Sequence, residues 1–463
     1  MARIFRHHVS PVKLTLAITD VALIAGCAFL AEWLRLSALD LSFDQTLVSV
    51  SAKLAIPAFA FPLLLGLGAY QSDAMGDMKV FFPRMIVAMT SGILLTAALA
   101  YLLPTLPLWR SILLLSFVFS TVAIFVNHAG FIHFAKDSFL GRRIVILGAG
   151  PEAVALKKEA DNSPEAGLKI VAVFAAPGDT VVYDDAVILD DILALSREVQ
   201  KLDCELIVIG DHLDNKTLPV EALIACKLAG VQIMDRLAFF EEVRGYVDLE
   251  SVKADWIVLA EGFRGRSILE RGVKRAMDIA ISIMFLLLTV PILLLSAIAI
   301  KLTSKGPVFY RQERVGLNRK IFNVLKLRSM TVDAEQPGVP EFAQEHDPRV
   351  TGIGGFLRHT RIDEIPQTLN VLKGDMSFVG PRPERPYFVD QLEERVPFYR
   401  ERHCLKPGIT GWAQIRYPYG ASFEDSRRKL EYDLYYIKNY SLFLDLLIIL
   451  QTLRVVLFPH GVR

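Results

Sequence analysis

The run of uncharged residues from Ile279 to Ile300 limits the possible folds of this chain more than any other stretch. Its 22 residues include no Asp, Glu, Lys or Arg, so a helix over them is long enough to cross a bilayer. Basic residues stand on both sides of the run, with Lys274 and Arg275 before it and Lys301 after it. A membrane-spanning helix carries its excess of Lys and Arg on one side, so these flanks argue against a simple span.

Pro291 lies near the middle of this run. Proline lacks a backbone N–H and its ring clashes with the preceding turn, so it kinks or breaks a helix. We therefore predict a re-entrant helix–break–helix over residues 273–301, which enters and leaves by the same face of the membrane. The alternative is a true span, which would place residues 301–463 on the opposite side from residues 140–260.

Four further apolar stretches occupy the first part of the chain and reach or approach the roughly 20 residues that a spanning helix needs. They are Leu14–Leu34, which contains Asp20, and Leu54–Tyr70, Met85–Leu103 and Ser111–Ala135. Lys and Arg stand before the first stretch, between the second and third, and after the fourth. The positive-inside rule therefore predicts four transmembrane helices in residues 1–138 with both ends in the cytoplasm. Four buried helices of a soluble bundle are the alternative.

The middle of the chain changes to short β-type runs that alternate with helical segments. The runs are Arg142–Leu147, Lys169–Phe174, Glu205–Gly210 and Val231–Asp235. This alternation predicts a parallel, doubly wound α/β sheet, and we assign residues 139–260 to a Rossmann-like domain. Gly148, Gly150 and Ala153 fit the dinucleotide-binding pattern, but the second run ends in Ala175-Ala176-Pro177 without the acid that would bind a ribose. We predict an accessory domain without cofactor-binding residues, although a working nucleotide site remains the alternative.

Charge is distributed unevenly along the chain. Residues 140–260 hold 12 basic and 21 acidic side chains, whereas residues 261–463 hold 30 basic and 22 acidic ones. Only the last part therefore has a field that suits anionic ligands or an anionic membrane surface. The four cysteines are far apart and form no CxxC pair, which argues against a zinc site and against a disulfide framework.

Asp363 and Glu364 form an adjacent pair of carboxylates within a run of cationic residues. Arg358 and Arg361 precede the pair, and Arg382 and Arg385 follow it. Arginine binds phosphate through two parallel donors, so the four arginines are candidate ligands for an anionic substrate, although each could instead pair with a carboxylate. For Asp363 the structural alternative is an N-cap of a helix that runs to about Leu372, with Glu364 as a first-turn acid.

Motifs in a fixed order cover about 190 residues around this pair. They include Lys274-Arg275-Ala276-Met277-Asp278, Gly306-Pro307-Val308-Phe309-Tyr310-Arg311, Lys326-Leu327-Arg328-Ser329-Met330, Asp347-Pro348-Arg349, Gly380-Pro381-Arg382-Pro383-Glu384-Arg385-Pro386 and Lys406-Pro407-Gly408-Ile409-Thr410-Gly411-Trp412. This region closely resembles the bacterial sugar transferases, the monotopic polyprenyl-phosphate hexose-1-phosphate transferases. The four spans and the Rossmann-like region resemble the long members that initiate exopolysaccharide or O-antigen assembly.

The resemblance implies a UDP-sugar donor, undecaprenyl phosphate as acceptor, Mg²⁺, a re-entrant helix broken at a proline, and an Asp–Glu dyad at Asp363 and Glu364. It assigns residues 261–463 to an α-rich catalytic domain on the cytoplasmic side of the bacterial inner membrane. The chain departs from many members at Arg319, where they have Gly, and at Val290, where they have Ser.

From the residues themselves we expect Asp363 to attack the β-phosphate of the donor and release UMP, after which the lipid phosphate takes the sugar phosphate from the aspartate. Glu364 and Asp363 are the candidate ligands for Mg²⁺, and a helix dipole is expected to keep Asp363 ionised. Lys274 and Arg275 are expected to meet lipid headgroups. The sequence leaves open the identity of the sugar and a homodimer, and no nucleic-acid partner is expected.

Two other functions fit parts of the chain. A membrane-anchored nucleotide-sugar dehydratase or epimerase would need a Tyr-x-x-x-Lys pair, which occurs nowhere in the sequence. A non-catalytic regulator of polysaccharide export would explain residues 140–260 but not the ordered motifs of the last part.

Overall fold

The computed structural model divides the chain into two compact units, Met1–Gly245 and Tyr246–Arg463. It describes residues 2–4, 7–39, 50–103, 109–134, 141–162, 167–175, 181–189, 194–210, 218–250, 252, 257, 262–263, 267–331, 334, 347–418, 420 and 422–458. The domain boundaries that we expected at 138–139 and 260–261 lie outside these residues.

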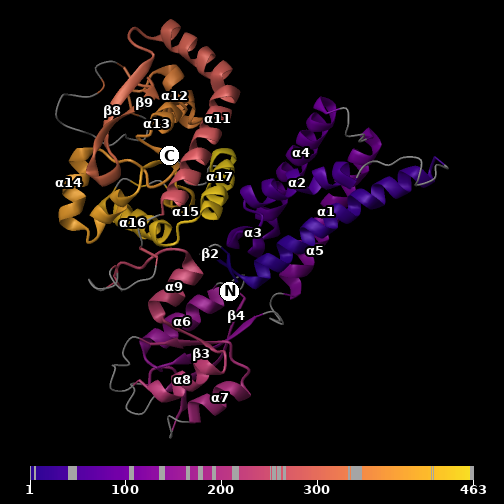
Figure 1. Cartoon of the computed structure of the whole chain (residues 1–463), viewed down its shortest axis with the longest axis vertical. Coiled ribbons are helices and arrows are strands. Elements are labelled where there is room, and N and C mark those ends of the chain that lie inside the picture. Colours follow the sequence, from indigo (N-terminus) through magenta and orange to yellow (C-terminus); the bar gives the residue numbers. More distant parts are fainter. Residues whose placement is uncertain are drawn as a thin grey trace. The chain divides into compact units, whose positions relative to one another are not determined.

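The first unit begins with a group of helices (Figure 1), and each predicted apolar stretch overlaps one of them, although the second prediction runs four residues past the end of its helix at Gly66. The elements are β1 (Ala2–Ile4), β2 (His7–Val9), α1 (Pro11–Ser37), α2 (Val50–Gly66), α3 (Ser72–Gly76), α4 (Met78–Leu102) and α5 (Arg110–Phe134). Helices α1, α4 and α5 are long and apolar enough to cross a membrane, and α2 is a shorter apolar helix. The helical prediction for this region is confirmed.

Asp20 in α1 is fully buried, and polar side chains surround its carboxylate. Its carboxylate lies 2.8 Å from His128 Nε2, and it accepts hydrogen bonds from the Tyr70 hydroxyl and the Asn127 amide at 2.8 Å each. An acidic residue within an apolar helix is costly unless it is paired. These partners explain how α1 accommodates Asp20.

The α/β part of the first unit contains the predicted parallel sheet. Its elements are β3 (Arg142–Leu147), α6 (Pro151–Asn162), β4 (Leu168–Ala175), β5 (Val187–Ile188), α7 (Leu195–Lys201), β6 (Leu206–Ile209), α8 (Val220–Leu228), β7 (Gln232–Asp235) and α9 (Arg236–Arg244). The strand order is β5-β4-β3-β6-β7, and all four pairings are parallel. The predicted Rossmann-like topology is confirmed. Of the segment expected to lack a ribose-binding acid, Ala176 and Pro177 lie outside the described residues.

The second unit contains one long helix and a set of short elements, which Figure 1 shows from salmon to yellow. They are α11 (Ile268–Thr303), β8 (Phe309–Val315), η5 (Leu317–Arg319), β9 (Ile321–Leu327), α12 (Gly352–His359), η6 (Ile362–Glu364), α13 (Gln367–Lys373), β10 (Ser377–Val379), α14 (Pro386–Arg395), η7 (Tyr399–Cys404), β11 (Gly408–Thr410), α15 (Trp412–Arg416), α16 (Phe423–Lys438) and α17 (Leu442–Leu457). Its main core forms around Trp412, Tyr435 and Tyr436, which are all almost fully buried.

Helix α11 contains the run that we predicted to be re-entrant. It is helical throughout its 36 residues, with Pro291 inside it, so the expected break is a bend in one helix and not an interruption. Figure 1 shows that the helix changes direction along its length. Helix α11 is also long and apolar enough to cross a membrane.

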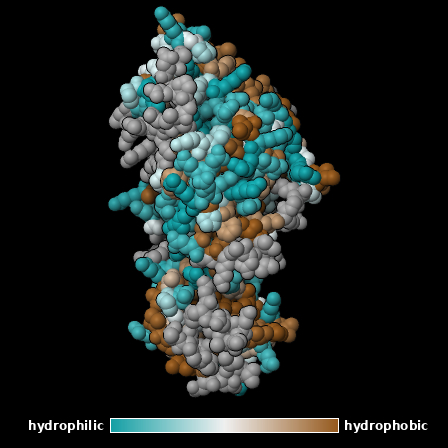
Figure 2. Space-filling view, turned by 90° about the vertical axis from the view of Figure 1, so that its left-hand side faces the viewer, coloured by the Kyte–Doolittle hydropathy of each residue, from teal (hydrophilic) through white to brown (hydrophobic). Residues whose placement is uncertain are grey.

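Both ends of α11 pack against the second unit, whereas its middle is exposed. Near the N-terminal end, Asp278 accepts hydrogen bonds from Ser377 Oγ and Phe378 N, each at 3.1 Å. Near the C-terminal end, Ile300 is fully buried and packs with Leu327. The large apolar side chains between these contacts are exposed, among them Leu287, Leu288, Leu294 and Leu295. The face of the second unit shown in Figure 2 is mainly hydrophilic, so this apolar midsection contrasts with it.

The turn between β8 and β9 has two residues with left-handed backbone, and neither of them is glycine. Asn318 and Arg319 have φ angles of 52° and 62°. The Arg319 guanidinium forms ion pairs with Asp390 at 2.8 Å and Glu393 at 3.2 Å. Arg319 therefore forms ion pairs that a glycine could not form, although glycine would adopt this backbone conformation more easily.

Candidate active site

Asp363 lies in a short 3₁₀ turn, η6, that follows a tight change of direction. Arg361 immediately before it has a left-handed backbone, with φ of 59° and ψ of 13°. The next helix, α13, begins after Pro366, and no side chain caps it. Asp363 is therefore not the N-cap of this helix, which excludes the structural alternative considered for it. The structure shows no hydrogen bond to the Asp363 carboxylate from the residues that it describes.

Glu364 is instead fixed in position by cations from two other segments. Its Oε1 atom lies 2.8 Å from Lys326 Nζ on β9 and 3.0 Å from Arg382 on the loop after β10. Arg361 lies 4.0 Å from Oε2. The adjacent carboxylates therefore differ, because cations hold Glu364, whereas Asp363 accepts no hydrogen bond from the described part of the chain.

The two carboxylates also differ in pKa. Burial raises the pKa of the Asp363 carboxyl to about 6, and the negative charge of Glu364 adds to this rise. Burial acts in the same direction on Glu364, but Lys326, Arg382 and Arg361 outweigh it and hold the pKa of Glu364 well below its usual value. We expected a helix dipole to keep Asp363 ionised, but burial has the larger effect on its pKa and disfavours the charged form.

The loop that carries Arg382 is held through its backbone carbonyls. The carbonyl of Pro381 accepts a hydrogen bond from Gly408 N at 2.9 Å, and that of Pro383 accepts one from Arg314 at 2.9 Å. Gly408 packs so closely that an added Cβ would lie 2.1 Å from Gly380 N, so no larger residue fits there. These contacts therefore fix the backbone of the loop and the position of the Arg382 Cα atom, from which the side chain reaches Glu364.

A buried ion pair supports the same loop from behind. Arg402 on η7 donates to the backbone carbonyl of Arg382 at 3.0 Å and pairs with Asp433 on α16 at 2.9 Å. It also donates to the Tyr399 hydroxyl at 2.6 Å. Arg402 is 5% exposed and Asp433 is 2% exposed, so this contact is shielded from water. It connects the core helix α16 to the residue that binds Glu364.

Asp363 and Glu364 line a large cavity within the second unit, with a volume of about 1210 Å³. Its polar part is lined by Arg314, Lys326, Arg328, Arg358, Arg361, Arg382, Arg385, Arg402 and Lys429. The rest is lined by apolar side chains of α11, β11 and α17. The cavity thus combines a strongly cationic region next to the carboxylates with an apolar region.

The predicted site residues fall into two groups. Arg358, Arg361, Arg382 and Arg385 all line the cavity with the dyad. Lys274 and Arg275, which we expected to meet lipid headgroups, instead contact protein groups.

Their own unit supplies their partners. Lys274 is 6% exposed and pairs with Asp445 at 2.8 Å and Asp278 at 3.1 Å. Arg275 donates to the carbonyls of Val371 and Leu372 at 2.5 and 2.6 Å. The two cations anchor α11 to the protein because buried carboxylates and the C-terminal carbonyls of α13 lie within their reach.

Sequence reasoning missed Lys326, Arg402 and Lys429. Lys326 belongs to the motif Lys326-Leu327-Arg328-Ser329-Met330, but nothing in that motif indicates that the Lys326 side chain contacts Glu364 across the fold. Arg402 and Lys429 lie in helical segments rich in charge, where surface positions are the ordinary expectation.

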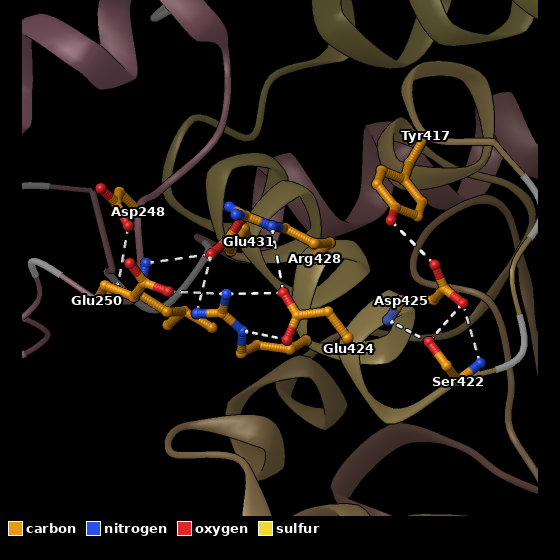
Figure 3. Close-up of polar contacts among 10 residues, drawn as sticks. Asp248, Glu250, Tyr417, Ser422, Glu424, Asp425, Arg428 and Glu431 are labelled. Atoms are coloured by element: carbon orange, nitrogen blue, oxygen red, sulfur yellow. Dashed lines mark hydrogen bonds and ion pairs between the residues drawn. The ribbon is translucent and has the colours of Figure 1, made fainter.

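The segment from α15 to α16 forms another polar wall of the cavity. Tyr417, which lines it, donates its hydroxyl to Asp425 Oδ1 at 3.0 Å (Figure 3). Asp425 and Ser422 cap the N-terminus of α16 reciprocally, as Figure 3 also shows. The capping box therefore also orients Tyr417.

Comparisons with known proteins agree with this arrangement. Residues 269–459 match the model of a family described as bacterial sugar transferase. The chain is 35% identical over 337 residues to a UDP-glucose:undecaprenyl-phosphate glucose-1-phosphate transferase of Klebsiella pneumoniae, covering 70% of this chain and 69% of that protein. The chain belongs to the bacterial sugar transferase family.

Two other relatives of the family carry similar names. The chain is 43% identical over 241 residues to the UDP-N-acetylgalactosamine-undecaprenyl-phosphate N-acetylgalactosaminephosphotransferase of Aeromonas hydrophila, covering 52% of this chain and 56% of that protein. It is 34% identical over 343 residues to the undecaprenyl-phosphate glucose phosphotransferase of Komagataeibacter xylinus, covering 70% of this chain and 60% of that protein. The match to these two relatives thus spans somewhat more than half of their length.

Proposed function

We propose that this protein transfers a hexose 1-phosphate from a UDP-sugar to undecaprenyl phosphate, releases UMP, and thereby initiates the assembly of an exopolysaccharide or related glycan. One observation carries the proposal: no residue that the structure describes donates a hydrogen bond to the Asp363 carboxylate, which lines a cationic cavity, while its neighbour Glu364 is bound by Lys326 and Arg382. The names of the relatives support the same donor and acceptor classes.

In the first step, an Asp363 carboxylate oxygen forms a bond to the β-phosphorus of the UDP-sugar. The bond between that phosphorus and the oxygen bridging the two phosphates breaks, and UMP leaves with the bridging oxygen. The product is a sugar phosphate bound to the aspartate. The step brings an anion to an anion, so cations around the phosphorus are required, and Arg358 and Arg361 line the cavity beside the carboxylate.

In the second step, a phosphate oxygen of undecaprenyl phosphate forms a bond to the same phosphorus. The bond from phosphorus to the aspartate oxygen breaks, which restores the carboxylate and gives undecaprenyl-diphosphate-sugar. Dividing the transfer in this way suits two anionic substrates that need not occupy the site together.

Mg²⁺ fits this site when it is shared with the substrate. Among the described residues, no group of three or more His, Cys, Asp and Glu side chains is placed to hold a metal ion. Mg²⁺ is commonly bound through one or two carboxylates together with substrate phosphates, and Asp363 and Glu364 provide two adjacent carboxylates. The ion would supply positive charge to the diphosphate, while Lys326 and Arg382 orient Glu364.

The contacts of α11 support a re-entrant arrangement. Both end regions pack on the same unit, and the middle exposes a broad apolar surface. In this arrangement, the cavity lies at the membrane surface on the side where cytosolic UDP-sugars and the lipid phosphate both arrive. The predicted location is the cytoplasmic face of the bacterial inner membrane.

The reaction is expected to lose rate as the pH falls through about 6, because Asp363 must be ionised to attack and burial raises its pKa to about 6. Below that value, kcat/KM for the UDP-sugar should fall about tenfold per pH unit. A Glu364→Gln variant should move this decline to lower pH, since Glu364 contributes to the raised pKa. Initial rates of UMP release between about pH 4.5 and 8 measure both effects. A rate that stays constant down to about pH 5 would rule out Asp363 as the titrating nucleophile.

A panel of UDP-sugars tests the proposed function. The full-length enzyme in detergent micelles is incubated with undecaprenyl phosphate and UDP-glucose, UDP-galactose or their N-acetyl counterparts, and UMP and the lipid product are quantified. At least one donor should give UMP and undecaprenyl-diphosphate-sugar in equal amounts. Release of UDP, or of free sugar phosphate without a lipid product, would contradict the proposal.

A further inference from the structure

The segment Tyr246–Glu250, which we call the connector, follows the first unit directly in the sequence and packs along helix α16. Helix α9 ends at Arg244, so Gly245 alone separates it from the connector. Val247 is fully buried in the main core of the second unit. The connector is therefore a folded part of the second unit and not a free linker.

Helix α16 presents different sides to the cavity and to the connector. Ser426, Lys429 and Asp433 line the cavity, and their spacing places them on one face of the helix. Glu431 follows Lys429 by two residues, which turns its side chain about 200° around the helix. The connector contacts this opposite side.

Backbone and side-chain contacts hold the connector on α16. The amide of Val247 donates to the backbone carbonyl of Glu431 at 3.1 Å, and that of Leu249 donates to its Oε1 atom at 3.4 Å. Glu250 pairs with Arg427 at 3.0 Å. Figure 3 shows Glu250 and Glu431 in this arrangement. Because Glu431 is fully buried, the connector seals this side of the helix from water.

Three tyrosine rings lead from the connector to the cavity. Tyr246 packs on Tyr432 of α16 with ring centroids 5.1 Å apart, and Tyr432 packs on Tyr417 with centroids 6.2 Å apart. Tyr417 lines the cavity, and its hydroxyl donates to Asp425. A displacement of Tyr246 therefore reaches the cavity wall through direct ring contacts.

We propose that Tyr246 is a positioning residue that holds Tyr417 in the cavity wall, so that the connector links the first unit to substrate binding. Tyr417, Ser426 and Lys429 offer an aromatic ring, a hydroxyl and a cation, which suit the base, sugar and phosphates of a UDP-sugar. Tyr246 does not line the cavity and acts through Tyr432. The inference rests on the proposed function, because it takes a UDP-sugar as the donor.

A Tyr246→Ala variant of the full-length enzyme tests this role, with Tyr440→Ala as its matched control. Each tyrosine packs its ring against a tyrosine of α16, but Tyr440 contacts Tyr436, and neither of these two lines the cavity. The KM for the UDP-sugar should rise about fivefold in Tyr246→Ala, with a smaller change in kcat, because Tyr417 loses its support. Tyr246→Phe keeps the ring and should restore the wild-type KM. Tyr440→Ala should keep the wild-type KM even where its thermal stability falls.

Combining Tyr246→Ala with Tyr417→Ala separates positioning from a general loss of stability. If Tyr246 acts through Tyr417, the double variant should have the same KM for the UDP-sugar as Tyr417→Ala alone, since the end of the path is already missing. Effects on KM that multiply would show that Tyr246 acts independently of Tyr417 and would overturn the proposal.

The outcomes distinguish the connector from the reaction. An active wild type whose KM for the UDP-sugar is unchanged by Tyr246→Ala, or raised equally by Tyr440→Ala, would overturn the role of Tyr246 and leave the proposed function intact. A wild type that releases no UMP from any UDP-sugar would overturn the proposed function and this inference together.

Discussion

An Asp363→Asn variant is expected to lose UMP release and lipid transfer together, by about 10⁴-fold or more, as when a nucleophile is removed from other enzymes. Asparagine has nearly the same size but no negative charge, so the cavity should keep its shape while the attacking group is lost. The Glu364 contacts with Lys326 and Arg382 do not involve the replaced atom and should persist.

An Asp390→Asn variant is the matched control. Asp390 forms an ion pair with Arg319, and neither residue lines the cavity. It should keep near-normal turnover. Both variants are assayed for UMP and lipid product at saturating substrate. Near-normal turnover of Asp363→Asn would mean that Asp363 has only a structural role.

Arg402→Met is expected to destabilise the second unit by about 3–5 kcal/mol, because it leaves the Asp433 carboxylate buried without its cation. It also removes the hydrogen bond to the carbonyl of Arg382. The loop should then hold Glu364 less firmly, so kcat should fall more than the KM for UDP-sugar changes. Thermal unfolding and steady-state kinetics of the full-length protein measure the two effects.

The double variant Arg402→Met, Asp433→Leu separates positioning from folding. Replacing both members of a buried pair by apolar residues commonly restores stability. We expect recovered stability with kcat still reduced, since the hydrogen bond to Arg382 remains absent. Lys373→Met, which removes an ion pair between the exposed Lys373 and Asp375, should cost about 1 kcal/mol or less. Full recovery of kcat in the double variant would show that Arg402 acts through stability alone.

The secondary structure of the first unit could be predicted because it follows from local patterns. Apolar runs at Met85–Leu103 and Ser111–Ala135 and short β runs such as Arg142–Leu147 can each be recognised within a single element. The parallel sheet then follows from strands alternating with helices.

The candidate site was only partly predictable because its contacts join distant segments. The cations of Lys326 and Arg382 reach Glu364 from two other parts of the chain, and no local pattern specifies these pairs. The left-handed backbone at Arg361 is also not marked by a glycine, so the turn that carries Asp363 resembled an ordinary helix start. For the same reason Lys274 was assigned to the lipid surface, although Asp445, far along the chain, binds it in the interior.

The most direct test of this account is to incubate the full-length enzyme with UDP-sugar labelled in its β-phosphate, without any lipid acceptor. The account predicts a protein adduct that carries one sugar phosphate on the peptide containing Asp363, with one UMP released for each adduct. Undecaprenyl phosphate should then discharge the label into lipid. An unlabelled protein that nevertheless transfers sugar phosphate once the acceptor is added would show direct transfer between the substrates and contradict the aspartate intermediate.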